Sequence, residues 1–334
     1  MRQEQFIARH RAEWDAFEQW LQRRGDGPSR TRTAATGAVP DDEIPARYRR
    51  LCQQLALARR RGYSPPLLER LQQLMHGGHA ALYRAPPPRW RRMLDFLVAG
   101  FPLLVRRQGR VMWASAALFA LPLAGVFLAL QWRPELIHHM LDPAQVAQFE
   151  RMYDPADPRQ TLGRESGGDW QMFGHYVMNN ISIGLRTFAG GLLAGVGTIA
   201  VLIANGVSIG AVAGHLQAVG HGDPFWRFVA GHAPLELTAI VIAGGAGLRL
   251  GLDLVAPGNR RRRDALVDAG RIGARLCLGV AAMLLLAAFV EAFWSSTQSI
   301  PAWIKFTVSG VLWALVLGWL WRGGHGAVED GDAA

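Results

Sequence analysis

The sequence predicts an all-α polytopic membrane protein with about six transmembrane helices and an N-terminal cytoplasmic helical bundle. Three observations support this fold class. Half of the 334 residues are hydrophobic, and the apolar ones are concentrated after residue 110. Several windows there reach the roughly 20 apolar residues that the hydrocarbon core of a bilayer requires. The preceding residues instead place apolar side chains at helical spacing among many charges, which is typical of amphipathic helices in water.

Residues 1–88 are predicted to form the cytoplasmic bundle. Segments at about 3–23 and 43–61 each carry an apolar stripe, and a third helix begins at the proline pair 65–66. The stretch 25–43 is rich in Gly, Ser, Thr, Pro and Asp and is predicted to be a flexible loop. The first helix lacks a continuous apolar core and a small-residue cleavage site, so no signal peptide is expected.

Residues 89–110 are predicted to form an interfacial amphipathic helix. The proline-rich APPP, residues 85–88, ends the bundle before it. Apolar side chains then alternate with arginines, which suits a helix whose apolar side enters the acyl boundary while its cations stay at the headgroups. Pro102 is expected to bend this helix into the first span.

The membrane domain is predicted over residues 111–322. Its long apolar windows lie at 111–130, 182–204, 232–252, 272–292 and 303–321. The shorter segment 206–220 contains His215 and is either a brief crossing or a re-entrant hairpin. A true crossing gives six spans, and this even number satisfies the positive-inside rule at every basic cluster.

The arginines set the predicted topology. The first span is preceded by Arg106, Arg107 and Arg110, which keep the N-terminus in the cytoplasm. The loop at about 131–176 is then external. Four consecutive arginines are expected at the cytoplasmic face, in contact with lipid headgroups: Arg260, Arg261, Arg262 and Arg263. The tail 323–334 also lies in the cytoplasm, so both termini are inside.

Polar side chains of three predicted spans fall at one depth, near the outer surface. This intramembrane polar cluster comprises Asn179, Asn180, Arg186, His232, Glu236 and Glu291. A charge at the centre of a membrane helix costs about 2.5–3.5 kcal/mol, so these groups are expected to face the bundle interior. Arg186 is the natural ion-pair partner of Glu236 or Glu291.

Two interpretations of this cluster stay open. It is either a polar clasp that fixes helix register, or a site for a proton, an ion, a metal or a lipid headgroup. His232 and Glu236 are four residues apart and share a helix face, as two metal ligands can. No metal site or cofactor is assigned, however, because one such pair is weak evidence and the His-Glu-x-x-His pattern of metalloproteases does not occur.

Glycines four residues apart form the second pattern in the membrane domain. They are Gly191, Gly195, Gly206, Gly210, Gly214, Gly247 and Gly251. Small residues at this spacing let helix backbones approach closely in lipid, so tight helix packing is expected. A substrate passage or a homo-oligomer face is the alternative.

Composition excludes other classes of function. The formal net charge is +10, and Lys305 is the only lysine. Because the arginines flank membrane spans, the positive-inside rule explains them and no nucleic-acid partner is expected. Cys52 and Cys277 have no metal-type spacing and are interpreted as small apolar fillers. No nucleophile–base pair is evident, so the protein is not expected to be an enzyme.

Two stretches of the membrane domain resemble the core of the stage II sporulation protein M family. They are NNISIGLRTFAGGLLAGVGTIAVLIANGVSIGAVAG, residues 179–214, and FWRFVAGHAPLELTAIVIAGGAGLRLG, residues 225–251. Upstream, PARYRRLCQQLALARRRG and HAALYR resemble the cytoplasmic half of non-sporulating relatives. The positions typical of the family are Asn180, Gly191, Asn205, Gly206, His232, Glu236 and Gly247.

The resemblance implies a bacterial inner-membrane protein without established catalytic activity. The sporulation member is similar to a scaffold that holds peptidoglycan-degrading partners at the septum, and relatives elsewhere tend to be encoded beside a MoxR-type ATPase and proteins with a von Willebrand-type domain. The leading hypothesis is therefore a non-catalytic scaffold that recruits cytoplasmic or envelope partners within membrane lipids. The long bundle argues against a role in sporulation itself. The rival is a permease or channel subunit that uses His232 and Glu236, and an intramembrane hydrolase ranks last.

Overall fold

The computed structural model describes residues 2–25, 41–82, 89–156 and 168–325. These parts of the chain are helical between short turns and contain no strand, so the predicted all-α class is confirmed. The described residues divide into two compact units, an N-terminal unit up to Arg91 and a membrane unit from Arg92 on. The APPP segment, most of the predicted loop 25–43 and most of the tail 323–334 lie outside the described residues.

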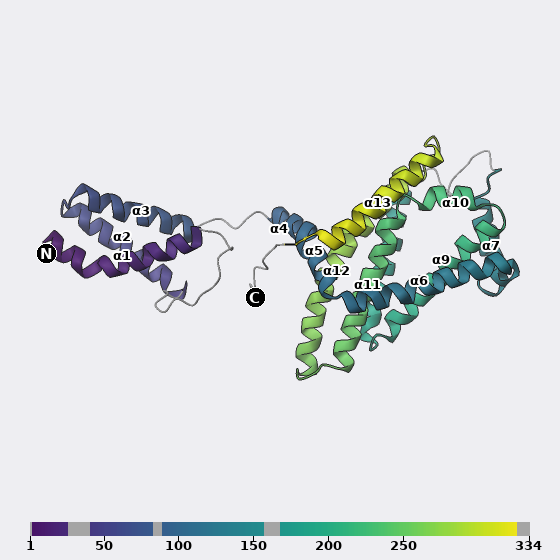
Figure 1. The fold of residues 1–334 in the computed structure, drawn as a ribbon, viewed down its shortest axis with the longest axis horizontal. Helices are drawn as coiled ribbons and strands as arrows, with labels where there is room; N and C mark the ends of the chain where they lie inside the picture. The colour runs from purple at the N-terminus through teal and green to yellow at the C-terminus, as the bar shows by residue number, and fades with distance from the viewer. Residues whose placement is uncertain (1, 26–40, 83–88, 157–167, 326–334) are drawn as a thin grey trace. The chain divides into compact units, whose positions relative to one another are not determined.

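The N-terminal unit is a bundle of three helices, α1 (Gln3–Gly25), α2 (Ile44–Arg60) and α3 (Pro65–Leu82) (Figure 1). One apolar core joins them, and its buried side chains are Phe6, Trp14, Phe17, Trp20, Ile44, Leu51, Leu55, Ala58, Leu67, Leu71 and Leu74. These residues lie on one face of each helix because the apolar positions recur every three or four residues. The core thus follows the predicted stripes.

Polar contacts fix the three helices against one another. The Trp14 indole Nε1 donates to Gln54 Oε1 at 2.6 Å inside the core, linking α1 to α2. Arg70 of α3 donates to Asp15 at 2.6 Å and to Glu18 at 2.8 Å on α1. These hydrogen bonds, the one to Glu18 first, raise the pKa of Arg70 above its ordinary value. The bundle therefore has its own core and its own interhelical links.

The membrane unit begins within a helical run that leads to the first apolar helix. The run consists of α4 (Arg89–Asp95), a π-helical turn (Phe96–Gly100) and α5 (Phe101–Arg107), and the unit boundary lies inside α4. The Arg106 guanidinium donates to the carbonyls of Leu320, at 2.6 Å, and Gly323. These carbonyls belong to the C-terminal end of α13 (Ala302–Arg322), where they have no partner within the helix. The run is thus tied to the end of α13.

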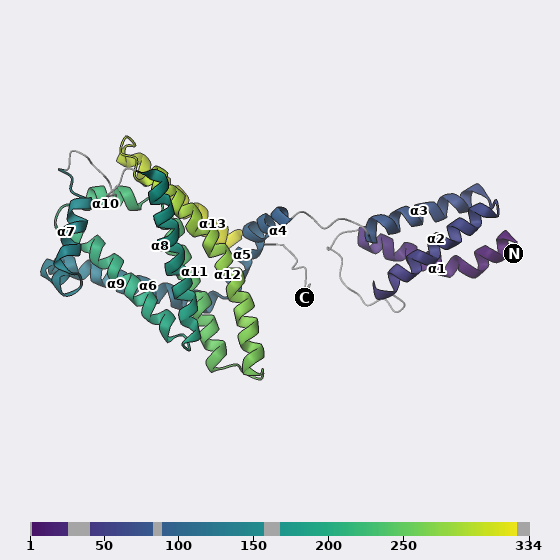
Figure 2. The same cartoon turned by 180° about the vertical axis from the view of Figure 1, so that it is seen from behind.

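Five helices of the described residues are long and apolar enough to cross a membrane. They are α6 (Gly109–Trp132), α9 (Val196–Ala218), α11 (Ala233–Val255), α12 (Arg262–Val290), which continues as a π-helical turn to Ser295, and α13 (Ala302–Arg322). A further helix, α8 (Asp169–Ala189), packs against α11 and α12 (Figure 2). Its 21 residues extend about 31 Å, the thickness of a hydrocarbon core. Short helices complete the unit: η3 (Pro134–His139), α7 (Pro143–Met152) and α10 (Gly222–Val229).

The predicted span 182–204 is wrong, because the chain turns in the middle of that window. After α8 comes a short 3₁₀ turn, η4 (Gly190–Leu192), and Ala194 and Gly195 then adopt left-handed backbone angles, with φ of 53° and 83°. These angles are incompatible with a continuing helix. Residues 206–218 are instead the second half of α9, so 206–220 is neither a separate crossing nor a re-entrant hairpin.

The seven glycines lie at two close backbone contacts. Gly206, Gly210 and Gly214 of α9 face the backbone of α6 at Phe119, Leu123 and Phe127. The turn between α8 and α9 lies on α11, with Gly191 against Gly247 and Gly195 against Gly251. A Cβ atom at Gly191 or Gly251 would overlap backbone atoms of the partner glycine. Side chains at these positions would therefore separate the helices.

Helices α11 and α12 form a hairpin (Figure 1), and the arginine run covers the end of its loop and the first two residues of α12. Buried Asp253 pairs with Arg249 at 3.1 Å and with Arg260 at 3.4 Å, and Arg260 also lies 3.3 Å from Asp268. The other three arginines of the run are exposed. Arg260 is thus partly committed to ion pairs within the protein, while headgroup contact by the run stays a prediction.

Candidate functional site

Three ionisable side chains meet inside the membrane unit: His232 and Glu236, at the start of α11, and Glu291, at the end of α12. One potential ligand atom from each lies within 4.8 Å of the other two. His232 is 5 % exposed and Glu291 8 % exposed, and Glu236 is mostly buried. We call these three residues the His–Glu–Glu cluster.

The local fold of α11 places two members of the cluster. His232 is the N-cap residue, and Pro234 occupies the first turn, where its fixed backbone angle suits a helix start. The Glu236 amide donates to the His232 carbonyl at 3.0 Å, so the two side chains lie one above the other. His232 Nε2 lies 3.9 Å from Glu236 Oε2. The positive end of the helix dipole favours a carboxylate here.

A π-helical turn places the third member. It runs from Glu291 to Ser295 and buries both residues against the start of α11. The Ser295 hydroxyl lies 3.2 Å from His232 Nδ1. The Ser295 carbonyl accepts a hydrogen bond at 2.6 Å from the buried Nζ of Lys305 on α13. Because π-helical turns are rare and recur at functional sites, this end of α12 marks the cluster independently of its charges.

Of the two predicted asparagines, Asn180 contacts the cluster directly, and Asn179 contacts Asn180. Asn180 of α8 is buried, and its Nδ2 lies 3.5 Å from Glu291 Oε2. Asn179 donates to Asn180 Oδ1 at 3.0 Å and is itself exposed. Helix α8 therefore closes the side of the cluster next to α12.

Arg186 does not join the cluster. It is exposed near the end of α8, and no ion pair in the described parts of the chain links it to Glu236 or Glu291. The expected pairing assumed a span over 182–204, which would place Arg186 at the same end as the carboxylates. In the structure α8 runs from Asp169 to Ala189, so Arg186 lies near its C-terminal end. It is six residues beyond Asn180, about 9 Å further along the helix.

Comparison with known protein families accounts for most of the chain. Residues 113–296 match the family described as Stage II sporulation protein M. The chain belongs to the stage II sporulation protein M family. Every residue of the cluster lies within the stage II sporulation protein M match, and so do all seven glycines. A second match, over residues 4–84, covers nearly all of the three bundle helices and is to a domain of unknown function (DUF8413). Neither the curated proteins nor the solved structures gave a match.

Sequence reasoning missed three residues around the cluster of this stage II sporulation protein M relative. They are Ser295, Lys305 and Tyr153. Burial, followed by the nearby Glu291 carboxylate, raises the pKa of Tyr153 above its ordinary value, so this phenol stays neutral. Lys305 stands out in the sequence as the single lysine, but its spacing did not predict a contact with the end of α12. Serine and tyrosine are too common in helices to stand out without the fold.

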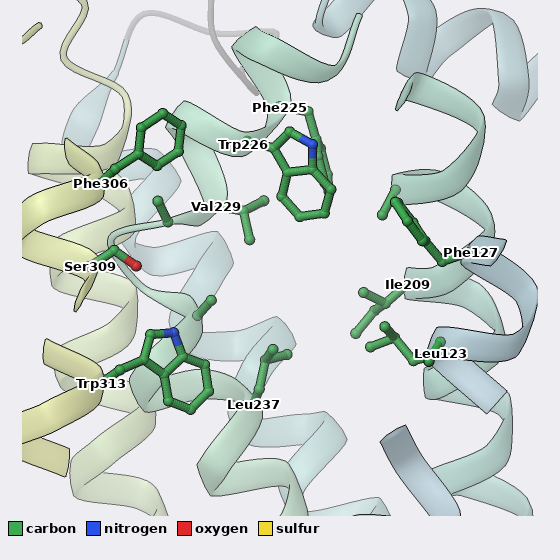
Figure 3. A pocket seen from close by; sticks show the side chains of 14 residues that line it. Leu123, Phe127, Ile209, Phe225, Trp226, Val229, Leu237, Phe306, Ser309 and Trp313 are labelled. Carbon is green, nitrogen blue, oxygen red and sulfur yellow. The ribbon is translucent and has the colours of Figure 1, made fainter. Parts of the chain in front are cut away.

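The membrane unit of this stage II sporulation protein M family member also contains an apolar cavity of about 660 Å³ (Figure 3). Side chains from α6, α9, α10, α11 and α13 line it, and they include Phe127, Phe225, Trp226, Phe306 and Trp313. None of the three cluster side chains lines this cavity. Its walls can accept a hydrocarbon chain, whereas the cluster can hold a proton or a cation.

Proposed function

We propose that this protein is a non-catalytic scaffold of the bacterial inner membrane, with both termini in the cytoplasm, and that its N-terminal bundle recruits partner proteins. The observation that supports this proposal most directly is the division into two compact units that match different families. A bundle with its own buried core and its own family is a module that can bind a partner while the apolar helices hold it at the membrane.

The charge of the bundle favours an acidic partner surface. Three consecutive arginines at the end of α2 are exposed: Arg59, Arg60 and Arg61. Arg49 on the same helix is exposed as well. Guanidinium groups bind carboxylates with two parallel hydrogen bonds, so such an edge suits a protein face rich in Asp and Glu. A MoxR-type ATPase system or an envelope hydrolase complex is the partner class that the family resemblance suggests.

Deletion of residues 1–88 tests the scaffold proposal. We expect the shortened protein to insert normally, since the membrane unit has its own core, but to lose the proteins that co-purify with the full chain after crosslinking in native membranes. Partner lists from affinity purification and mass spectrometry provide the measurement. A gentler variant, Arg59→Glu with Arg60→Glu and Arg61→Glu, should lower partner recovery about 10-fold or more without unfolding the bundle, because like charges then face each other.

Matched charge changes on the membrane unit provide the control. The triple variant Arg261→Glu, Arg262→Glu and Arg263→Glu also alters three exposed arginines and should leave the partner list of the bundle intact, provided that insertion is normal. An unchanged list after deletion of residues 1–88 would contradict the proposal.

A permease or channel subunit is the second candidate, and the buried His–Glu–Glu cluster is the observation that favours it. Buried ionisable groups inside a membrane domain commonly line ion or proton pathways. Under this alternative, Glu236→Gln abolishes ion or lipid flux in proteoliposomes while the thermal unfolding midpoint stays unchanged. A polar clasp gives the opposite result, with a lower unfolding midpoint and with partner recovery intact in the folded fraction.

A further inference from the structure

We propose that His232, Glu236 and Glu291 bind one divalent transition-metal ion, of which Zn²⁺ is the representative. The site lies between the start of α11 and the π-helical turn that ends α12. It goes beyond the scaffold proposal, because it depends only on the membrane unit.

The donor set fits this class of ion. One imidazole nitrogen and two carboxylate oxygens are common ligands of Zn²⁺. Imidazole favours transition metals, whereas Mg²⁺ and Ca²⁺ are bound mainly by oxygen ligands. Three protein ligands leave a further coordination position for water or a partner group. The chemistry therefore selects a first-row transition metal over a hard cation.

The distances leave room for an ion at the centre of the cluster. Zn²⁺ lies about 2.0–2.2 Å from nitrogen and oxygen ligands, so its tetrahedral ligands are about 3.3–3.6 Å apart. His232 Nε2 and Glu236 Oε2 are 3.9 Å apart, and all three potential ligand atoms lie within 4.8 Å of one another. Movements of about 1 Å or less, which side-chain torsions can supply, close this gap.

The hydrogen bonding around the cluster leaves the inward atoms without a partner. His232 Nδ1 is held by the Ser295 hydroxyl, which orients the ring and leaves Nε2 facing Glu236 at a distance too long for a hydrogen bond. Within the described residues, Glu236 accepts no hydrogen bond, and Glu291 accepts only the long one from Asn180. Metal-binding histidines share this arrangement, in which a neighbour fixes one ring nitrogen and the other is the ligand.

The charge of the cluster also calls for a cation. Two carboxylates in an apolar interior repel each other and lose their hydration. In the parts of the chain that the structure describes, neither forms an ion pair with an arginine or lysine side chain. Lys305 is committed elsewhere, since its Nζ donates to the Ser295 carbonyl and lies 5.8 Å from the Trp294 ring centre. One divalent cation would neutralise both carboxylates at once.

The same unit offers a contrasting His–Glu pair. His215 Nε2 and Glu150 Oε1 are 2.8 Å apart, so they bond directly, and no third ligand of the described residues joins them. A His–Glu pair that bonds directly, at 2.8 Å, thus differs from the cluster, where the corresponding distance is 3.9 Å, and Glu150→Gln is a matched control for Glu236→Gln.

The test uses the full-length protein in detergent, stripped with a chelator and titrated with Zn²⁺ by calorimetry. We expect saturable binding of one equivalent. Glu236→Gln and Glu291→Gln should each weaken it about 100-fold or more, and Ser295→Ala, which frees the ring of His232, about 10-fold. Glu150→Gln should leave the dissociation constant unchanged. Substituting Co²⁺ should give a visible absorption band that is lost in the same variants.

Thermal unfolding keeps the test decisive if a variant folds poorly. Zn²⁺ should raise the unfolding midpoint of the wild type and of Glu150→Gln, because binding to the folded state alone stabilises it. A folded wild type that neither binds Zn²⁺ nor gains stability would overturn the proposal. Undiminished binding by folded Glu236→Gln and Glu291→Gln proteins would do so as well, since it would show that the ion binds elsewhere.

Discussion

Replacing Trp14 with alanine should strongly destabilise the N-terminal bundle and leave the membrane unit folded. Trp14 is 1 % exposed at the centre of the bundle core. Truncation of a buried tryptophan costs about 3–5 kcal/mol. Gln54 would also lose its hydrogen bond from the indole, a buried polar group left unpaired. A bundle of this size has only about 4–12 kcal/mol of stability in total, so the loss removes much of it.

Limited proteolysis of the full-length protein in detergent measures this effect. Cleavage within the bundle should become at least 10-fold faster, while the apolar helices stay protected. Trp132→Ala is the control, because Trp132 is 80 % exposed and its loss should leave the cleavage rate of the bundle unchanged. Under the scaffold proposal, Trp14→Ala should also lose co-purifying partners as deletion of residues 1–88 does. Wild-type protease resistance of the Trp14→Ala bundle would contradict the assigned core.

Replacing Gly247 with alanine should destabilise the membrane unit. An added Cβ atom would overlap the Thr198 hydroxyl and approach the carbonyls of Thr187 and Phe188 within 2.7 and 3.0 Å. Carbonyl groups can move only with their helix, so α8 would have to shift away from α11. Overpacking of this kind costs about 1–3 kcal/mol. This cost outweighs the gain in helix propensity when alanine replaces glycine, which is about 1 kcal/mol.

Gly125 provides the matched control, since it also lies within an apolar helix but has open space where a Cβ atom would be. Gly125→Ala should leave the thermal unfolding midpoint in detergent unchanged or slightly higher, whereas Gly247→Ala should lower it. Equal unfolding midpoints for the two variants would contradict the close contact of Gly247 with the end of α8 and the start of α9.

Apolar length was enough to predict most of the membrane helices, but not where the chain turns. The window 182–204 is apolar over most of its length despite Arg186, so hydropathy merges the end of α8 with the start of α9. The turn depends on the left-handed backbone at Ala194 and Gly195, which hydropathy does not register. The predicted span left out the first part of α8, residues 169–181, for the opposite reason. It carries polar side chains, Asn179 and Asn180 among them, that lower its hydropathy although it packs inside the unit.

The candidate site was partly predictable because two of its groups lie on one helix. The spacing of His232 and Glu236 fixes their common face whatever the rest of the fold. Glu291 could be assigned to the site because it was expected at the same depth in the next predicted span. Arg186 was misplaced because its depth depended on the boundaries of α8. Ser295 could not be predicted, since the π-helical turn that aims it at His232 leaves no pattern in the sequence.

The two hydrogen bonds from the Arg106 guanidinium to the end of α13 have a consequence for biosynthesis. The two acceptor carbonyls lie more than 200 residues after the arginine, at Leu320 and Gly323. During translation, the guanidinium can therefore form these hydrogen bonds only after α13 has left the ribosome. A chain that stops short of Leu320 would keep a cation beside the first apolar helix without its acceptors, and such an unfinished molecule differs chemically from a complete one.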